Sequence, residues 1–405
     1  MSELYAISGN DNAEARLLSE GAVLFRDVGV DSASEFEQFS DRFVSEWMGY
    51  QDRASKRSSV RGNVHTSTDT PSTFPIALHC ESSFTSRWPQ KIFFHCMTAP
   101  THGGRTPICD VRQVYKDLDS AVREKFEKLG VMYYRNFGRG VGMDWRDVFQ
   151  AEDQEAVEAY CAAHSILAEW PEEDHLRTTQ VRPAVLEHPV TGEKSWFNHA
   201  LALSKFSLVG DLSQTLMRQS GERNLPNNSY FGSGEQISDE DIQHIRDIHD
   251  RNTRHFDWQP GDVLMLDNMR VAHGREPFEG PRLIHAAMAD PLTWEEIGVE
   301  LQMPGCQPQF IDPAPTANSL SVESKPDRVD DDLNEWFLTA IASELKLDRV
   351  AGEDNFSEIG GDSLAGVTLI GNLFDQFGVD IQLERLLGDQ TIEAILKDIQ
   401  PQTKN

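Results

Sequence analysis

The chain has 405 residues, with 66 acidic and 37 basic side chains and a formal net charge of −29. At roughly 100–200 residues per domain, this length allows two or three domains. The composition, 39% apolar and 25% charged, is that of a folded globular protein and excludes a disordered or fibrous chain. A charge this negative repels phosphate backbones and anionic lipids, so nucleic acids and membranes are disfavoured as partners.

The N-terminal sequence has no basic segment followed by an apolar run, and no stretch reaches the roughly 18–20 consecutive apolar residues of a membrane span. We therefore expect a cytoplasmic protein. The five cysteines, Cys80, Cys96, Cys109, Cys161 and Cys306, are scattered and never spaced as C-x-x-C. This pattern predicts reduced thiols and gives no support to a disulfide framework or a structural zinc site.

Residues 1–303 combine strand and helix patterns and form the first predicted domain. Helical spacing is present at 120–129 and 155–170, and runs rich in β-branched and aromatic residues are present at 92–97, 131–137, 181–188, 261–268 and 282–290. The strands do not alternate with helices, and no glycine-rich phosphate loop follows a strand. The pattern therefore favours an α+β domain built on a sandwich or jelly roll over a dinucleotide-binding sheet.

Residues 304–327 have the Pro- and Ser-rich composition of a linker, which places a domain boundary there. Downstream, apolar residues recur at helical spacing over 333–347, 366–379 and 392–399. These segments predict a small all-α domain of three or four short helices over residues 328–405. Acidic residues exceed basic ones in this domain, so it has a strongly acidic surface.

His79 and Glu81 are two positions apart in a predicted strand, so both side chains point to one face and could bind one metal ion. A second pair of this kind, His255 and Asp257, shows that the spacing also arises by chance. His273 follows a buried strand near the end of the domain. Two histidines and one carboxylate on one face leave the other side of an octahedral iron open for a cosubstrate and O₂.

Segments of residues 60–295 resemble, in order, those of the TauD/TfdA-like iron(II)/2-oxoglutarate dioxygenases, and within them the SyrP-like hydroxylases of nonribosomal peptide pathways. The segments are GNVHTSTDTP, LHCESSF, WPQKIFFHC, HGGRTPICD, YYRNFGRGVGMDW, LRTTQVRPAVLEHPVTGEKSWFNH and LDNMRVAHGREPFEGPR. The resemblance implies a double-stranded β-helix with flanking helices, and Fe(II), 2-oxoglutarate and O₂ as cofactors. It also implies His79, Glu81 and His273 as the iron ligands.

The same resemblance implies that Thr106 and Arg282 hold the far carboxylate of 2-oxoglutarate, for which the planar fork of an arginine is well suited. Thr106 could instead be an ordinary strand residue, and Arg275 is an alternative to Arg282, although we interpret it as a structural ion-pair former. His199 and Ser233 stand where relatives usually have Gln and Asp. These two departures leave the relatives' substrate open for this chain.

Related halogenases replace the metal-binding carboxylate with a small residue, so the presence of Glu81 favours hydroxylation over halogenation. Desaturation or epoxidation would need only a different substrate pose. In such an enzyme the protein positions the substrate and excludes water, because the radical chemistry belongs to the metal and the cosubstrate.

The segment DNFSEIGGDSL, residues 354–364, resembles the attachment site of acyl and peptidyl carrier proteins, and the resemblance extends over about 328–400. GGDSL in isolation could also be a helix cap. The resemblance implies a four-helix carrier domain in which Ser363 carries 4′-phosphopantetheine. Its phosphodiester would lie favourably at a helix N-terminus.

An oxygenase fused to a carrier domain suggests that the substrate is an acyl or aminoacyl thioester on Ser363, in nonribosomal peptide or related natural-product biosynthesis. A phosphopantetheinyl transferase and an acyl-loading (adenylation) enzyme are then expected partners. Two alternatives remain open. The dioxygenase could act on a free small molecule while the carrier serves a separate step, or the first domain could be a non-catalytic docking module.

Overall fold

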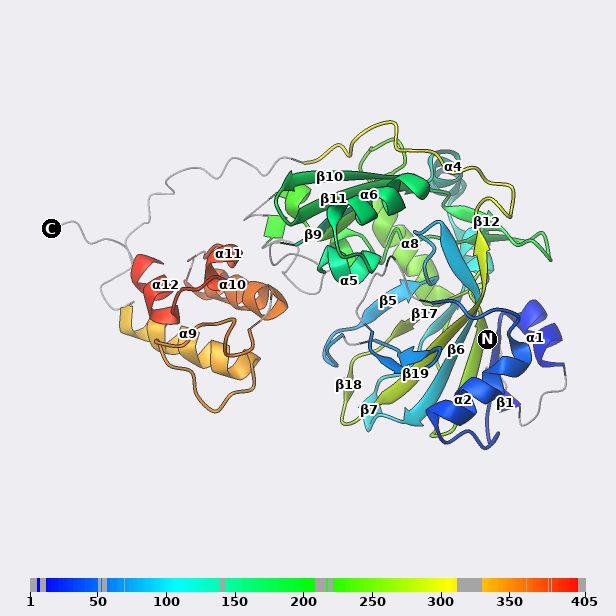
Figure 1. Cartoon of the computed structure of the whole chain (residues 1–405), viewed down its shortest axis with the longest axis horizontal. Helices are drawn as coiled ribbons and strands as arrows, with labels where there is room; N and C mark the ends of the chain where they lie inside the picture. Colours follow the sequence, from blue (N-terminus) through cyan, green and yellow to red (C-terminus); the bar gives the residue numbers. More distant parts are fainter. Residues whose placement is uncertain are drawn as a thin grey trace.

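The computed structural model describes residues 6–7, 12–49, 52, 57–68, 70–138, 143–207, 216–217, 221–311, 330–361, 363–377, 379 and 381–399. β-Sheets with peripheral helices form the N-terminal part, and helices α9 to α12 form a group of their own near the C-terminus (Figure 1).

The largest sheet has seven strands in the order β1-β2-β16-β6-β19-β4-β3. Its strands are β1 (Ala6–Ile7), β2 (Ala22–Phe25), β3 (Ser59–Arg61), β4 (Val64–Thr66), β6 (Arg87–Thr98), β16 (Val263–Asp267) and β19 (Leu283–Thr293). The long strand β6 lies between β16 and β19 and is antiparallel to both, with Phe94 opposite Leu264 on one side and Ala286 on the other.

Successive residues of the central strands pack on opposite faces of this sheet, as the two-residue repeat of a strand requires. Val263 and Met265 pack against helices α1 (Ala13–Glu20) and α2 (Ala33–Ser40), whereas Leu264 belongs to the cluster on the inner face. Both faces are therefore covered. This explains why the strand within residues 261–268 has an unbroken apolar sequence where a half-exposed strand would alternate.

A four-stranded sheet packs on the inner face, in the order β15-β8-β17-β5. Its strands are β5 (Ile76–His79), β8 (Ile108–Asp110), β15 (Thr253–Arg254) and β17 (Val271–Arg275). Ile108 and Val271 share a buried cluster with Phe94 and Leu264 of the large sheet, so the two sheets lie face to face. This arrangement confirms the predicted jelly-roll architecture.

The remaining elements surround this sandwich. A second four-stranded sheet has the order β10-β11-β9-β14. β12 and β13 form a short hairpin, and β7 pairs with the distant strand β18. These strands are β7 (His102–Gly103), β9 (Val131–Phe137), β10 (Ile166–Glu172), β11 (His175–Arg182), β12 (Val185–Glu187), β13 (Lys194–Trp196), β14 (Asn227–Phe231) and β18 (Phe278–Glu279). The helices are η1 (Asp41–Phe43), α3 (Val111–Asp117), α4 (Ser120–Leu129), α5 (Trp145–Phe149), α6 (Gln154–Ala163), η2 (Lys205–Ser207), η3 (Glu222–Asn224) and α8 (Asp239–Arg251).

The prediction of one helix over 155–170 is wrong in its second half. Helix α6 ends at Ala163, Ser165 adopts a left-handed backbone with φ of 54°, and β10 then begins at Ile166. Ile166 pairs with Gln180 of β11. Pairing with a distant strand therefore overrides the local helical spacing, which is the usual reason that such patterns mislead.

The C-terminal part consists of α9 (Asp330–Glu344), α10 (Ser363–Phe377), α11 (Leu383–Leu386) and α12 (Ile392–Ile399). The helical patterns at 333–347, 366–379 and 392–399 correspond to α9, α10 and α12. Phe337, Ile341, Phe356, Leu373 and Ile395 are buried in its core. None of the helices in the described ranges is both long and apolar enough to cross a membrane.

Of the predicted linker, residues 312–327 lie outside the described residues. Its first part is described and contacts the first domain, because the Phe310 ring packs 5.0 Å from the ring of Tyr134 and 6.1 Å from that of Tyr230.

Phe36 gives a test of the packing between α2 and the large sheet. It is 0% exposed and its ring stacks 5.1 Å from that of His95. Phe36→Ala should lower the free energy of unfolding by about 3–5 kcal/mol, because it leaves a cavity in a close-packed interior. Urea unfolding followed by tryptophan fluorescence measures this change. Leu18→Ala, at a side chain that is 38% exposed, is the control; equal losses for the two variants would contradict the packing described here.

Candidate metal and cosubstrate site

Two side chains from adjacent strands and a third from the turn after one of them meet at one point between the sheets. In the antiparallel pair of β5 and β17, His273 lies directly opposite His79, and Glu81 follows β5 by two residues. The Nε2 atoms of His79 and His273 lie 3.9 and 4.0 Å from Oε2 of Glu81. The three potential ligand atoms all lie within 4.8 Å of one another, close enough to surround one metal ion.

Asn268 fixes the backbone at Glu81. Its side-chain Oδ1 accepts the Glu81 N–H at 2.7 Å, and its Nδ2 donates to the carbonyls of Glu81 and Pro89, both at 2.9 Å. Asn268 is fully buried. A buried amide with three satisfied hydrogen bonds is a strong positional restraint, and the sequence analysis did not identify it.

The hydrogen bonds and charges around the three groups suit a divalent cation. His79 Nδ1 lies 2.8 Å from the carbonyl of Ala77 and donates to it when neutral, which leaves the Nε2 lone pair for a metal. Burial, reinforced by His79, holds the pKa of His273 well below its usual range, so His273 is neutral. Burial alone would raise the pKa of Glu81, but its surroundings, first of all the charge of Arg57, outweigh burial and hold that pKa well below its usual range. Two imidazole nitrogens beside an ionised carboxylate fit Fe(II).

Arg57 is a further charged group at this point that the sequence analysis missed. Its Nη2 lies 2.6 Å from Oε2 of Glu81, and both side chains are less than a tenth exposed. Arg57 therefore neutralises the carboxylate inside the protein.

A cavity of about 330 Å³ opens beside the three residues. Its wall combines charged, apolar and hydroxyl side chains. Those outside the potential metal ligands include Arg57, Phe94, Thr106, His199, Leu203, Arg275, Arg282 and Ile284.

Thr106 and Arg282, the predicted cosubstrate residues, both line this cavity. Trp258 Nε1 donates to Oγ1 of Thr106 at 3.0 Å, and Arg282 Nε donates to the carbonyl of Gly104 at 3.0 Å. Burial lowers the pKa of Arg282 to about 10, so the guanidinium stays charged at neutral pH. Within the described residues Arg282 has no carboxylate partner, which leaves its charge available to an anion in the cavity.

The glycines before Thr106 make room for Arg282. Gly104 has φ of +65°, and a Cβ there would lie 2.8 Å from Cβ of Phe278 and 3.1 Å from Cδ of Arg282. A side chain at this position is therefore disfavoured both by the backbone conformation and by space.

Arg275 lines the cavity but has a different set of contacts from those expected. Its guanidinium donates to the backbone carbonyls of Thr70, Pro71 and Phe74 at 2.8, 2.6 and 2.6 Å. These carbonyls take the place of the carboxylate in the ion pair that we expected. Arg275 therefore holds the loop that precedes β5 against the cavity.

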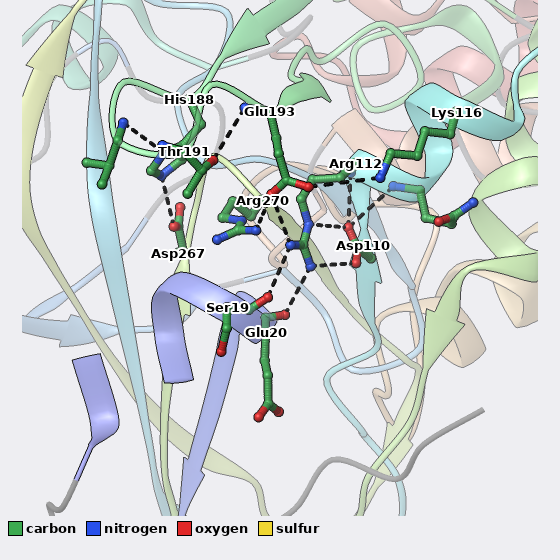
Figure 2. A network of polar contacts seen from close by, with 12 residues as sticks. Ser19, Glu20, Asp110, Arg112, Lys116, His188, Thr191, Glu193, Asp267 and Arg270 are labelled. Atoms are coloured by element: carbon green, nitrogen blue, oxygen red, sulfur yellow. Dashed lines mark hydrogen bonds and ion pairs between the residues drawn. The ribbon is translucent and has the colours of Figure 1, made fainter. Parts of the chain in front are cut away.

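A polar network behind the site joins the turn between β16 and β17 to its surroundings (Figure 2). Arg270, next to β17, pairs with Glu193 of the β12–β13 hairpin, and His188 of that hairpin lies 3.1 Å from Asp267 at the end of β16. Arg112 at the start of α3 also reaches Glu193, with Nη1 3.5 Å from Oε2. The network ties the strand that carries His273 to the hairpin that leads to His199.

The two departures from the relatives' pattern lie in different places. His199 is buried and lines the cavity, with its ring 5.3 Å from that of His79. Ser233 lies in the turn after β14 and is absent from the described cavity wall. Only His199 is therefore placed to contact a substrate.

Ser363 is the first residue of α10, so its backbone lies at a helix N-terminus, as the carrier resemblance implies. The preceding turn is close-packed, because a Cβ at Gly361 would lie 2.4 Å from the ring of Phe356.

Comparison with known proteins gives two family matches. Residues 2–288 match the taurine catabolism dioxygenase TauD, TfdA family, and residues 335–399 match the phosphopantetheine attachment site. The chain is 38% identical over 277 residues to the dapdiamide synthesis protein DdaC of Enterobacter agglomerans, covering 68% of this chain and 84% of DdaC. It is 29% identical over 286 residues to a clavaminate synthase-like protein of Arabidopsis thaliana, covering 68% of this chain and 83% of that protein. A taurine dioxygenase structure from Burkholderia xenovorans aligns with a TM-score of 0.42 at 16% identity, over 78% of this chain and 90% of that one.

Proposed function

Because the chain belongs to the TauD/TfdA dioxygenase family and carries a phosphopantetheine attachment domain, we propose that it oxidises an acyl or aminoacyl group held as a thioester on its own Ser363. The enzyme is an iron(II)- and 2-oxoglutarate-dependent dioxygenase. The observation that carries the proposal is the set of His79, Glu81 and His273 beside a cavity in the same chain as the carrier domain.

His79, Glu81 and His273 hold the Fe(II) in this proposal. When bound, the iron supplies O₂ activation coupled to oxidation of 2-oxoglutarate, so that hydroxylation converts substrate C–H, O₂ and 2-oxoglutarate into alcohol, succinate and CO₂. Glu81 fills the position that a halide would need, which favours hydroxylation, desaturation or epoxidation over halogenation. The chain's own task is to orient the substrate C–H and to exclude water.

Arg282 and Thr106 bind the far carboxylate of 2-oxoglutarate in this proposal. The charged guanidinium and the hydroxyl line one cavity with the metal-binding residues. A partly buried arginine with no carboxylate partner among the described residues gains most from a dicarboxylate ligand, because a charge-assisted pair is strong where water is excluded. Arg275 is less suited, since its donors are used on backbone carbonyls.

Contacts between the two parts of the chain support presentation of the substrate by the attached carrier domain. Leu216 and Leu225 belong to the same buried hydrophobic cluster as the core of the four-helix carrier, and Met217 packs against it. The cavity wall includes Leu203 before these residues and Asn227 after them. One segment of the oxygenase therefore both contacts the carrier and borders the cavity.

The carrier also defines partners. A phosphopantetheinyl transferase is needed to modify Ser363, and we propose an adenylation enzyme as the source of the acyl group. Similarity to DdaC supports a place in natural-product biosynthesis. A linker of about 20 residues has a reach of roughly 25 Å, which gives effective concentrations on the order of mM without a tight interface.

His273→Ala or His79→Ala should abolish substrate-coupled succinate formation, because two ligands hold the metal poorly. Binding is measured without O₂, from the charge-transfer absorption of the Fe(II)–2-oxoglutarate complex, which should also disappear. His102→Ala, at an exposed histidine, should keep both signals. An unchanged absorption band in His273→Ala would disprove this ligand set.

Arg282→Ala should strongly raise the 2-oxoglutarate concentration needed for half-maximal rate. Removing one partner of a buried charge pair costs about 2–5 kcal/mol of binding free energy. Gly104→Ala should act in the same direction but less strongly, because its methyl group displaces the Arg282 side chain. Titration of the charge-transfer band with 2-oxoglutarate gives both values. If Arg275→Ala weakened 2-oxoglutarate binding more than Arg282→Ala, the wrong arginine would have been chosen.

Ser363→Ala should eliminate product while the Fe(II)–2-oxoglutarate absorption remains, because only the tether is lost. Intact-protein mass spectrometry, with a panel of acyl groups loaded on the wild-type chain, detects the product. Ser343→Ala, at an exposed serine of α9, is the control.

A mixture of Ser363→Ala chains with loaded His273→Ala chains should restore some product. The yield should be lower than in wild type, because the effective concentration of the tether is lost. Full activity of Ser363→Ala on the free acid or amino acid would show instead that the dioxygenase acts on a free small molecule and that the carrier serves a separate step.

A further inference from the structure

His199 is a histidine of the cavity wall that lies outside the proposed metal ligands, at a position where the sequence departs from that of its relatives. It follows the β12–β13 hairpin and is held from three sides. Its backbone N–H donates to the hydroxyl of Tyr133 at 2.8 Å, its ring packs 4.8 Å from that of Phe84, and its Nδ1 lies 2.7 Å from Oγ of Ser83. The ring is therefore fixed in position beside the proposed metal ligands.

Hydrogen-bond accounting assigns the tautomer of this ring. Ser83 is 0% exposed, and within the described residues its hydroxyl has no partner except Nδ1 of His199. If Nδ1 carried the proton and donated it to Oγ, the Ser83 hydroxyl hydrogen would be buried without an acceptor, which is unfavourable. Ser83 therefore donates to Nδ1, and the proton of the neutral imidazole resides on Nε2.

Nε2 of His199 has no hydrogen-bond partner among the described residues. The buried polar atoms that lack a partner do not include it, so Nε2 is accessible. Since His199 lines the cavity, Nε2 is the ring nitrogen that opens onto it. A ring whose Nδ1 accepts the Ser83 hydroxyl carries a single proton, on Nε2. His199 thus presents one fixed, uncharged N–H donor to the cavity.

We propose that His199 is a specificity-determining residue that donates its Nε2–H to a carbonyl oxygen of the substrate, and so sets which carbon faces the metal. This inference rests on the proposed function. A neutral donor matches a neutral acceptor such as a thioester or amide carbonyl, whereas the anionic ends of 2-oxoglutarate are served by arginine. Ser83 is the positioning residue that fixes the tautomer.

Two isosteric variants separate this role from a structural one. Gln places an amide near the position of Nε2, so His199→Gln should stay within about threefold of the wild-type kcat/KM. Asn places its amide near Nδ1 and keeps the bond to Ser83, so His199→Asn should lose about 10- to 100-fold, the effect of one hydrogen bond in a closed site. Both variants should retain the Fe(II)–2-oxoglutarate absorption. The probe is the wild-type carrier loaded with the acyl group of highest turnover.

A loaded analogue in which a methylene group replaces the thioester carbonyl identifies the acceptor. If the thioester carbonyl accepts the bond, His199→Asn and wild type should process this analogue equally. If an amide of the acyl group accepts it, the difference between them should persist. Equal losses in the Asn and Gln variants, or loss of the absorption band in both, would overturn the proposal.

The tautomer is tested without turnover. Long-range ¹H–¹⁵N spectra of the metal-free full chain, labelled with ¹⁵N-histidine, should show the Nε2–H form of His199, and Ser83→Ala should shift it toward a mixture. An Nδ1–H form in wild type would overturn the proposal. If Ser363→Ala keeps full activity on a free substrate, the proposed tethering fails, but the spectra and the Asn and Gln comparison with that free substrate still decide the role of His199.

Discussion

The register between β5 and β17 is the constraint on which the site depends. Pairing of His273 with His79 brings two residues that are far apart in the sequence onto one face of the sheet β15-β8-β17-β5. Glu81, two residues after His79, joins them on that face. A slip of one residue would turn His273 toward the opposite face. The burial of both sheets in a shared apolar cluster excludes such a slip, because it would expose core residues and bury polar ones.

Contacts outside the ligand set convert this register into a rigid site. Asn268 clamps the backbone of Glu81 to the β16–β17 turn, and the network around Arg270 and Glu193 joins that turn to the hairpin before His199. The potential metal ligands and the cavity wall are thus supported by the same turn. Side chains locked by packing and by further hydrogen bonds can hold a reacting group within the narrow tolerance that catalysis needs.

The sequence predicted the parts of the fold that are governed by local pattern. The jelly roll was indicated by apolar strand runs, and α4 (Ser120–Leu129) and α12 (Ile392–Ile399) by helical spacing. The misassigned segment after Ala163 and the contacts of Arg57 and Asn268 have a different origin. Each depends on a partner many positions away, which neither spacing nor composition reports. Family resemblance, by contrast, supplied the candidate ligands that the structure brings together at the cavity.

Charge offers a physical reason for the proposed tethering of the substrate. The protein as a whole has a formal net charge of −29, yet the cavity wall contains Arg57, Arg275 and Arg282. At physiological ionic strength the electrostatic field of this net charge is screened beyond about 8 Å. The field therefore does little to steer distant anions toward the cavity, and it repels anions that are close to the surface. In the proposed function, Arg282 then retains 2-oxoglutarate by short contacts inside the cavity. A carrier-bound acyl group avoids this barrier, because its local concentration is set by the length of the linker and is independent of electrostatic attraction.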